Sequence, residues 1–228
     1  MPIAFAHRGA RSELPENTIP AFQRALALGA TGLESDVWCS SDGDAVLVHD
    51  PTVRRGLRRV RVARTTADQL AGLDVPRLRD LYEVCGDEFE LSLDLKNRDA
   101  ASLVVRIARE RDASARTWLC HPDREFLTEL RGVDPDVRLV LSTWKRALPG
   151  SFERHIADLA ALGIDALNMH HSEWTPGLVA LAHRFDLRAF AWDVQEVRHL
   201  RAVCSMQIDG VYSDHVDRMV GVLAEWTR

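Results

Sequence analysis

Two carboxylates lie two residues apart in the stretch 33–50, LESDVWCSSDGDAVLVHD, which has the pattern of an apolar β-hairpin. The spacing points Glu34 and Asp36 to the same face of one strand, and His49 ends the strand expected to pair with it. Carboxylates are costly to bury unless they are paired, hydrogen-bonded or bound to a metal. The hairpin therefore predicts a site of chemistry within an otherwise apolar element.

A second charged pair, Asp94 and Lys96, has the same spacing in the predicted strand 89–96, FELSLDLK. Asp94 completes an acidic trio with Glu34 and Asp36. Three carboxylates are hard oxygen ligands that suit Mg²⁺ or Ca²⁺ and do not favour zinc. Such a cation relieves repulsion among the carboxylates and withdraws charge from a phosphoryl group. The trio therefore predicts a divalent metal site that acts on a phosphate ester.

Histidines and cations stand at the ends of the same predicted strands. His7 and His49 change charge near neutral pH, which suits a general acid and a general base. Arg8 and Lys96 could neutralise the remaining phosphate oxygens. Each residue alone also has a structural interpretation, as a hydrogen-bonded histidine or a salt-bridge partner, but their convergence on one end of the fold favours catalysis. A structural role is expected for the remaining strand-end groups: His121, His170, His171, His215 and Cys120.

The elements that position these residues alternate between strand and helix patterns, as in βα units with a parallel sheet. Eight strands are expected to start at Ile3, Gly32, Phe89, Thr117, Arg138, Ala166, Leu187 and Gly210. Eight units in this length predict an α/β TIM (β/α)8 barrel, whose catalytic residues stand where the strands end. The main alternative is a doubly wound open sheet, which the lack of a glycine-rich phosphate loop after the first strand weakens.

One segment interrupts this alternation, at about residues 51–75, and is interpreted as a small insertion on the barrel mouth after the second strand and its hairpin. It contains a basic run at 54–61, RRGLRRVR, read either as a solvated loop or as a contact surface for an anionic ligand or lipid. The chain shows no linker and no strong repeat, so residues 1–228 are expected to form a single domain.

Composition narrows the classes of protein to which the chain can belong. The formal net charge of -5 argues against non-specific binding to nucleic acid or anionic membranes. No apolar run approaches the roughly 18 residues of a membrane span, and the N-terminus lacks the features of a signal peptide. The four cysteines are far apart, which is typical of reduced core residues. We therefore expect a cytoplasmic protein with no stable membrane insertion, and the sequence assigns no oligomeric state.

The stretch 6–53 resembles the N-terminal signature of the glycerophosphodiester phosphodiesterase family. HRG, PENT, an alanine–phenylalanine helix, E-x-D and HD follow one another in the order of that signature. The segments LSLDLK, RAFAWDV and IDGVYSD fit the family's later segments, so the resemblance covers nearly the whole chain. It implies a TIM barrel, in agreement with the independent count of strands.

The resemblance also implies a role for each candidate residue. These are acid/base catalysis by His7 and His49, metal ligation by Glu34 and Asp36, phosphate contacts by Arg8 and Lys96, and an apolar wall formed by Trp192. In the family's mechanism a glycerol hydroxyl attacks phosphorus and expels the alcohol, and the resulting cyclic phosphate is hydrolysed to glycerol phosphate. A glycerophosphodiester is thus the expected small-molecule substrate, and Mg²⁺ or Ca²⁺ the expected cofactor.

Two departures from the family pattern widen the range of substrates. The third strand usually carries E-x-K, whereas this chain has Asp94, which is one methylene shorter. The related sphingomyelinase D enzymes also carry aspartate at this point. The insertion after His49 is short, which leaves a more open mouth able to admit a larger lipid. A lysophospholipase D-like enzyme acting on lysophospholipids is therefore the nearest alternative, and a catalytically silent barrel that binds phosphodiesters is the third.

Overall fold

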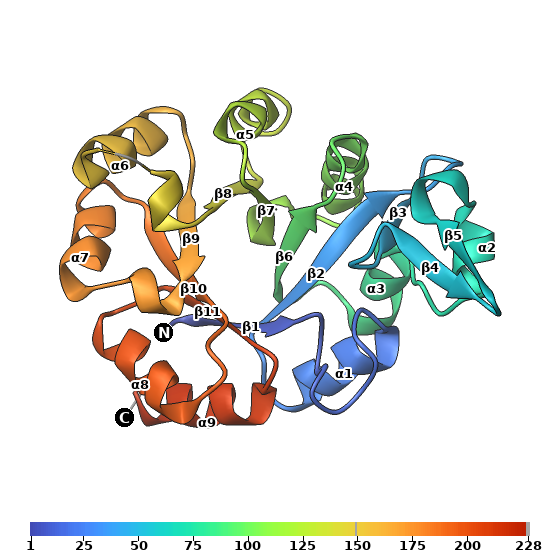
Figure 1. The fold of residues 1–228 in the computed structure, drawn as a ribbon, viewed down its shortest axis with the longest axis horizontal. Helices are drawn as coiled ribbons and strands as arrows, with labels where there is room; N and C mark the ends of the chain where they lie inside the picture. The colour runs from blue at the N-terminus through green and yellow to red at the C-terminus, as the bar shows by residue number, and fades with distance from the viewer. Residues whose placement is uncertain (149, 227–228) are drawn as a thin grey trace.

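A closed parallel barrel forms the centre of the computed structural model, which describes residues 1–148 and 150–226 (Figure 1). Within those residues its eight strands are β1 (Ile3–His7), β2 (Gly32–Cys39), β6 (Glu90–Leu95), β7 (Thr117–His121), β8 (Arg138–Ser142), β9 (Ala166–His170), β10 (Arg188–Trp192) and β11 (Gly210–Ser213). Strand β1 pairs in parallel with both β2 and β11, which closes the sheet. The predicted TIM barrel is confirmed, and the open doubly wound sheet is wrong. The predicted strand starts differ from the observed ones by a single residue, at β6 and β10.

Helices surround the barrel and pack on the outer faces of its strands (Figure 1), apart from the short helix Ala67–Ala71, which packs in a small apolar cluster of the insertion. They are α1 (Ile19–Ala27), α2 (Ala67–Ala71), α3 (Leu78–Cys85), α4 (Asp99–Glu110), α5 (Arg124–Arg131), α6 (Phe152–Ala161), α7 (Pro176–Arg184), α8 (Val197–Ser205) and α9 (Val216–Glu225), with 3₁₀ turns at Val62–Arg64, Ser114–Arg116, Lys145–Ala147 and His171–Glu173. Helix α1 shows how sequence sets such an element: the Thr18 hydroxyl caps its start, and Gly29, with φ 95°, lies just beyond its end. In the part of the chain that the structure describes, no helix is both long and apolar enough to span a bilayer.

The connection between β2 and α3 carries additional strands. Strand β3 (Ala45–Leu47) pairs antiparallel with β2, and a separate hairpin consists of β4 (Thr52–Arg55) and β5 (Arg58–Arg61). This hairpin projects from the molecule at the right of Figure 1. Val53 at its base packs against a small apolar cluster that contains Val62 and Leu70. This packing holds the base of the hairpin against the rest of the protein. The hairpin belongs to a βα connection, so it lies on the side of the strand C-termini.

Aromatic side chains fill the barrel interior beneath the mouth. The Phe5 ring stacks on Tyr212 with 4.6 Å between centroids, and Phe190 meets both Phe5 and Trp118 edge to face. Gly32 makes room for this packing, because a Cβ there would lie 2.6 Å from the Phe5 ring. These close-packed rings therefore form a rigid layer beneath the polar residues at the mouth.

A buried aspartate before β8 gives a direct test of what holds the fold together. Asp134 is 1% exposed and accepts hydrogen bonds from the backbone N–H groups of Asp136 and Val137 and from Arg109 Nε. We expect Asp134→Ala to lower the free energy of unfolding by about 2 kcal/mol, since the amides lose their acceptor. Chemical denaturation measures this, with Asp136→Ala, at an exposed neighbour, as the control that changes little.

The ionisation of Asp134 should also make the stability of the fold depend on pH. Burial raises the pKa of Asp134, but its hydrogen bonds and Arg109 outweigh that effect and hold the pKa below its usual value. The unfolded chain then binds the proton more tightly, so the stabilisation is present above the unfolded pKa and is lost as pH falls through the folded one. Equal sensitivity to acid in wild type and Asp134→Ala would contradict this assignment.

Candidate functional site

Strand register brings the candidate residues together at the C-terminal end of the barrel. His7 on β1 is the register partner of Glu34 on β2, and Asp36 on β2 is the register partner of Asp94 on β6. Neighbouring residues in a parallel sheet point to the same side, so the four side chains form two adjacent rows. Glu34 and Asp36 are two residues apart on β2 and point to the same side, so the two rows form one site.

The acidic trio is compact, with Glu34 and Asp36 buried and Asp94 partly exposed. Glu34, Asp36 and Asp94 each offer a carboxylate oxygen, and these oxygens lie within 4.8 Å of one another. Burial, together with repulsion from Asp36 and Asp94, raises the pKa of Glu34 to about 8, and burial also raises the pKa of Asp94. Hard oxygen donors at this spacing, with charges that repel one another, fit a divalent cation such as Mg²⁺ or Ca²⁺.

Asp36 differs from its two neighbours because cations surround it. Lys96 Nζ lies 2.8 Å from its Oδ1, Arg8 Nε lies 3.1 Å from its Oδ2, and Asn17 Nδ2 donates a hydrogen bond to Oδ2 at 3.2 Å. Burial raises the pKa of Asp36, but Lys96 and Arg8 outweigh it, so the pKa is lowered. Lys96 Nζ also lies 3.5 Å from Asp94 Oδ2. Both predicted phosphate-binding cations therefore stand beside the acidic trio.

Two of these contacts depend on unusual backbone geometry. Arg8 and Asn17 have φ angles of 54° and 55°, in the left-handed region that costs energy for residues other than glycine. This geometry lets the Arg8 backbone N–H donate to Glu34 Oε2 at 2.9 Å while its guanidinium reaches Asp36. Asn17 was not among the candidates predicted from the sequence, although the PENT motif contains it.

His7 is held in a defined orientation by Asp214. Its Nδ1–H donates to Asp214 Oδ1 at 2.6 Å, and its Nε2 lies 3.8 Å from Glu34 Oε2. Burial lowers the pKa of His7, but Glu34 and Asp214 more than offset this, so the pKa is raised. Sequence reasoning missed Asp214; its only signal is its place directly after the last barrel strand, β11.

His49 lies apart from His7. Strand β3 ends at Leu47, and the His49 ring, which is partly exposed, donates from Nδ1 to Asp50 Oδ1 at 2.9 Å. It lines a neighbouring hollow together with Glu16, whose carboxylate pairs with Arg8 at 3.0 Å. The two predicted acid/base histidines therefore line different hollows, and the Arg8–Glu16 ion pair joins a lining residue of one to a lining residue of the other.

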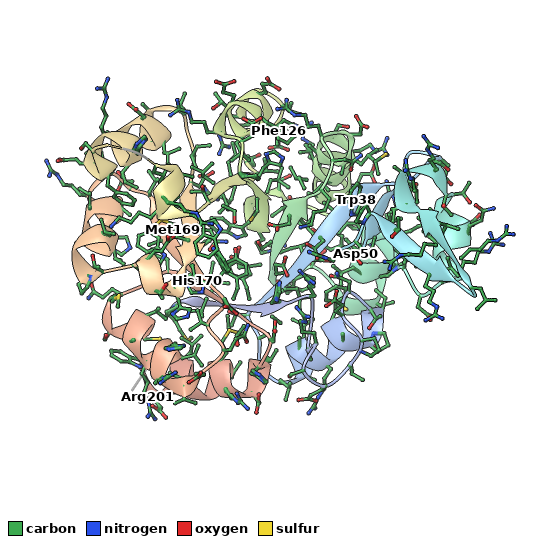
Figure 2. All side chains as sticks on the ribbon, viewed as in Figure 1. Trp38, Asp50, Phe126, Met169, His170 and Arg201 are labelled. Carbon is green, nitrogen blue, oxygen red and sulfur yellow. The ribbon has the colours of Figure 1, made fainter. Side chains whose placement is uncertain are left out.

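A cavity of about 370 Å³ opens beside His7 and the carboxylates Glu34 and Asp94. The indole of Trp192 forms part of its wall and packs against the rings of Trp144 and His170; the latter is labelled in Figure 2. The cavity also has polar lining residues that sequence reasoning did not identify: Arg11, Ser142, Asn168, Asp193, Gln195 and Asp214. The cavity can thus hold a small polar molecule whose anionic centre faces the carboxylate and cation cluster.

The chain is similar in sequence and in fold to glycerophosphodiester phosphodiesterases. The Glycerophosphoryl diester phosphodiesterase family model matches residues 7–218. A glycerophosphodiester phosphodiesterase of Bacillus altitudinis is 30% identical over 242 residues, covering 97% of this chain and 98% of the relative. The crystal structure of a glycerophosphodiester phosphodiesterase from Thermotoga maritima is 24% identical, covers 97% of this chain and 98% of that chain, and superposes with a TM-score of 0.85. An Oleispira antarctica phosphodiesterase, solved with the product sn-glycerol-3-phosphate, is 19% identical, with coverage of 98% and 97% and a TM-score of 0.83.

Proposed function

The chain belongs to the glycerophosphoryl diester phosphodiesterase family and is a phosphoric diester hydrolase, and we propose that histidine acid/base catalysis assisted by a divalent metal drives its reaction. The substrates are glycerophosphodiesters, and the products are glycerol 3-phosphate and an alcohol. The Oleispira antarctica structure, whose barrel superposes on this one, contains sn-glycerol-3-phosphate and supports that product. We place the site in one catalytic domain, residues 1–228, with an insertion at about 51–75.

The observation that carries this proposal is the pair of adjacent rows at the barrel mouth. His7, oriented by Asp214, stands beside Glu34, while Asp36 and Asp94 lie in the next row. A bound Mg²⁺ or Ca²⁺, held by Glu34, Asp36 and Asp94, would supply positive charge to the phosphoryl oxygens. A proton-transfer group next to such a cluster is what phosphodiester cleavage requires.

The chain's own residues then account for substrate binding and proton transfer. Arg8 and Lys96 exchange part of their contact with Asp36 for contacts with phosphate oxygens. Trp192 covers the apolar side of the substrate. His7 Nε2 accepts the proton of the glycerol hydroxyl as its oxygen bonds to phosphorus. The bond from phosphorus to the departing alcohol breaks, and that oxygen takes a proton. Water then opens the cyclic phosphate to give glycerol 3-phosphate.

His49 is the second acid/base group of this proposal and donates the proton to the departing alcohol. Its ring is oriented by Asp50 in the way that Asp214 orients His7. The Arg8–Glu16 ion pair lies between the two hollows. An anionic substrate that draws Arg8 away from Glu16 would break this ion pair and connect the two hollows. Both histidines would then reach the same phosphodiester.

The test is an assay with glycerophosphocholine in the presence of Mg²⁺, Ca²⁺ or EDTA, measuring glycerol 3-phosphate and choline. We expect equal amounts of both products with a divalent cation and loss of turnover in EDTA that the cation restores. Turnover that is undiminished in EDTA would refute the metal requirement. Turnover of lysophosphatidylcholine but not of glycerophosphocholine would instead favour the lysophospholipase D-like activity.

A further inference from the structure

The hairpin formed by β4 and β5 concentrates positive charge that the proposed chemistry does not use. Residues 51–67 contain six arginines and no aspartate or glutamate, in a chain whose formal net charge is -5. The arginines are all exposed: Arg54, Arg55, Arg58, Arg59, Arg61 and Arg64. Figure 2 shows nitrogen-tipped side chains extending from this hairpin at the right edge of the molecule. The segment is thus a basic projection on an otherwise acidic protein.

These arginines are paired with one another across the hairpin. Arg54 lies opposite Arg59, and Arg55 lies opposite Arg58, in the antiparallel register. Like charges directly opposite one another destabilise a β-ribbon. Among the described residues, the one ion pair made by these four joins Arg59 to Asp50, at 3.3 Å. Apart from that pair, no carboxylate of the described residues compensates the repulsion among the four arginines, as expected of a surface that meets an external anion.

The tip of the hairpin presents an apolar side chain between the arginine pairs. Gly56, with φ 59°, and Leu57 form a two-residue turn, in which glycine at the first position allows the tight reversal. Leu57 is 100% exposed, and a leucine at a loop tip gains nothing from contact with water. A basic ribbon with one apolar residue at its tip combines the two interactions that hold peripheral proteins on bilayers.

We propose that the β4–β5 hairpin docks the protein on the surface of an anionic phospholipid bilayer, with the arginines against headgroup phosphates and Leu57 inserted among the headgroups. Charge complementarity sets the orientation, because the net negative charge of the whole protein opposes any approach that does not lead with the hairpin. The hairpin belongs to the connection that starts at His49 and Asp50, so docking holds the mouth side of the barrel close to the lipid. The inference goes beyond the proposed function and does not depend on it.

Vesicle flotation tests the proposal with pure phosphatidylcholine and with equimolar phosphatidylcholine–phosphatidylserine. We expect binding to the anionic vesicles alone, weakened by high salt. Arg55→Gln/Arg58→Gln should weaken it about 25-fold, at about fivefold for each arginine near the surface. The control Arg106→Gln/Arg201→Gln changes the net charge equally, at exposed positions on α4 and α8 away from the hairpin, and should retain binding. Leu57→Ser should weaken binding by up to about tenfold.

Equal binding to both kinds of vesicle, or equal loss in the control and hairpin variants, would overturn the proposal. Tighter binding to single-stranded RNA, with no effect of Leu57→Ser, would also overturn it and identify a nucleic-acid partner instead. Turnover of water-soluble glycerophosphocholine should be unchanged in the hairpin variants. Failure of the docking proposal is thereby separated from failure of the proposed function.

Discussion

His7→Ala is expected to lower kcat for glycerophosphodiester hydrolysis by roughly 10²–10⁴-fold, the usual contribution of a positioned acid or base. The reason is geometric: Asp214 fixes the Nδ1–H of His7, so Nε2 is the nitrogen free to exchange a proton beside the acidic trio. Steady-state kinetics at saturating divalent metal measures the loss. Metal binding, followed by calorimetry, should persist in the variant, because no carboxylate is removed.

A second histidine–aspartate pair in the same chain is a matched control. His183 Nε2 lies 2.7 Å from Asp209 Oδ2, but Asp209 immediately precedes β11 and so stands at the opposite end of the barrel. His183→Ala should therefore lower stability and leave kcat near the wild-type value. A His7→Ala enzyme with wild-type kcat would remove His7 from the mechanism.

Asp214→Asn separates the orientation of His7 from its chemistry. The charge of Asp214 and its hydrogen bond with His7 both raise the pKa of His7. Asparagine can still accept that hydrogen bond but lacks the charge, so the imidazole titration should move to lower pH. We expect an intermediate fall in kcat, with the NMR titration of His7 shifted in that direction. A merely structural role for Asp214 would leave this titration where it is.

Most of the barrel and of the candidate site could be predicted from the sequence, because both depend on the spacing of residues along the chain. A period of two places Glu34 and Asp36 on one face of β2 without reference to the rest of the fold. Alternating strand and helix patterns then require a parallel sheet, and its closure brings the C-terminal ends of β1, β2 and β6 together. Motif recognition adds the roles, which spacing alone leaves open.

Contacts between distant segments are the part that sequence reasoning missed. Asp214 is 207 residues from His7 along the chain, and only closure of the barrel between β1 and β11 brings them into contact. Asn17 reaches Asp36 through a left-handed backbone turn that no periodicity reveals. The position of His49 depends on where β3 ends and on the ion pair between Arg8 and Glu16, which are tertiary features.

Glu34→Gln removes a direct ligand and is expected to weaken divalent metal binding. Loss of a residue that only hydrogen-bonds a ligand weakens metal affinity by roughly 10–100-fold, so the loss here should be larger. In the metal-free protein the pKa of Glu34 is about 8, so the carboxyl group is mostly protonated at pH 7. A cation must displace that proton, so apparent affinity should rise with pH up to about 8 and then level off. Isothermal titration calorimetry in buffers of different ionisation enthalpy measures the released proton directly.

The same substitution should stabilise the metal-free protein, which distinguishes a functional charge cluster from a structural one. The folded pKa of Glu34 lies above its ordinary value of 4.5, so the metal-free wild type loses stability as pH rises from there to about 8. Glu34→Gln removes that loss and should raise Tm at pH 8 more than at pH 5. Glu90→Gln is the control: its carboxylate accepts a hydrogen bond from Trp118 Nε1 at the other end of the barrel, so metal affinity should be retained. Unchanged metal affinity in Glu34→Gln would mean that the buried charge serves another purpose than holding a cation.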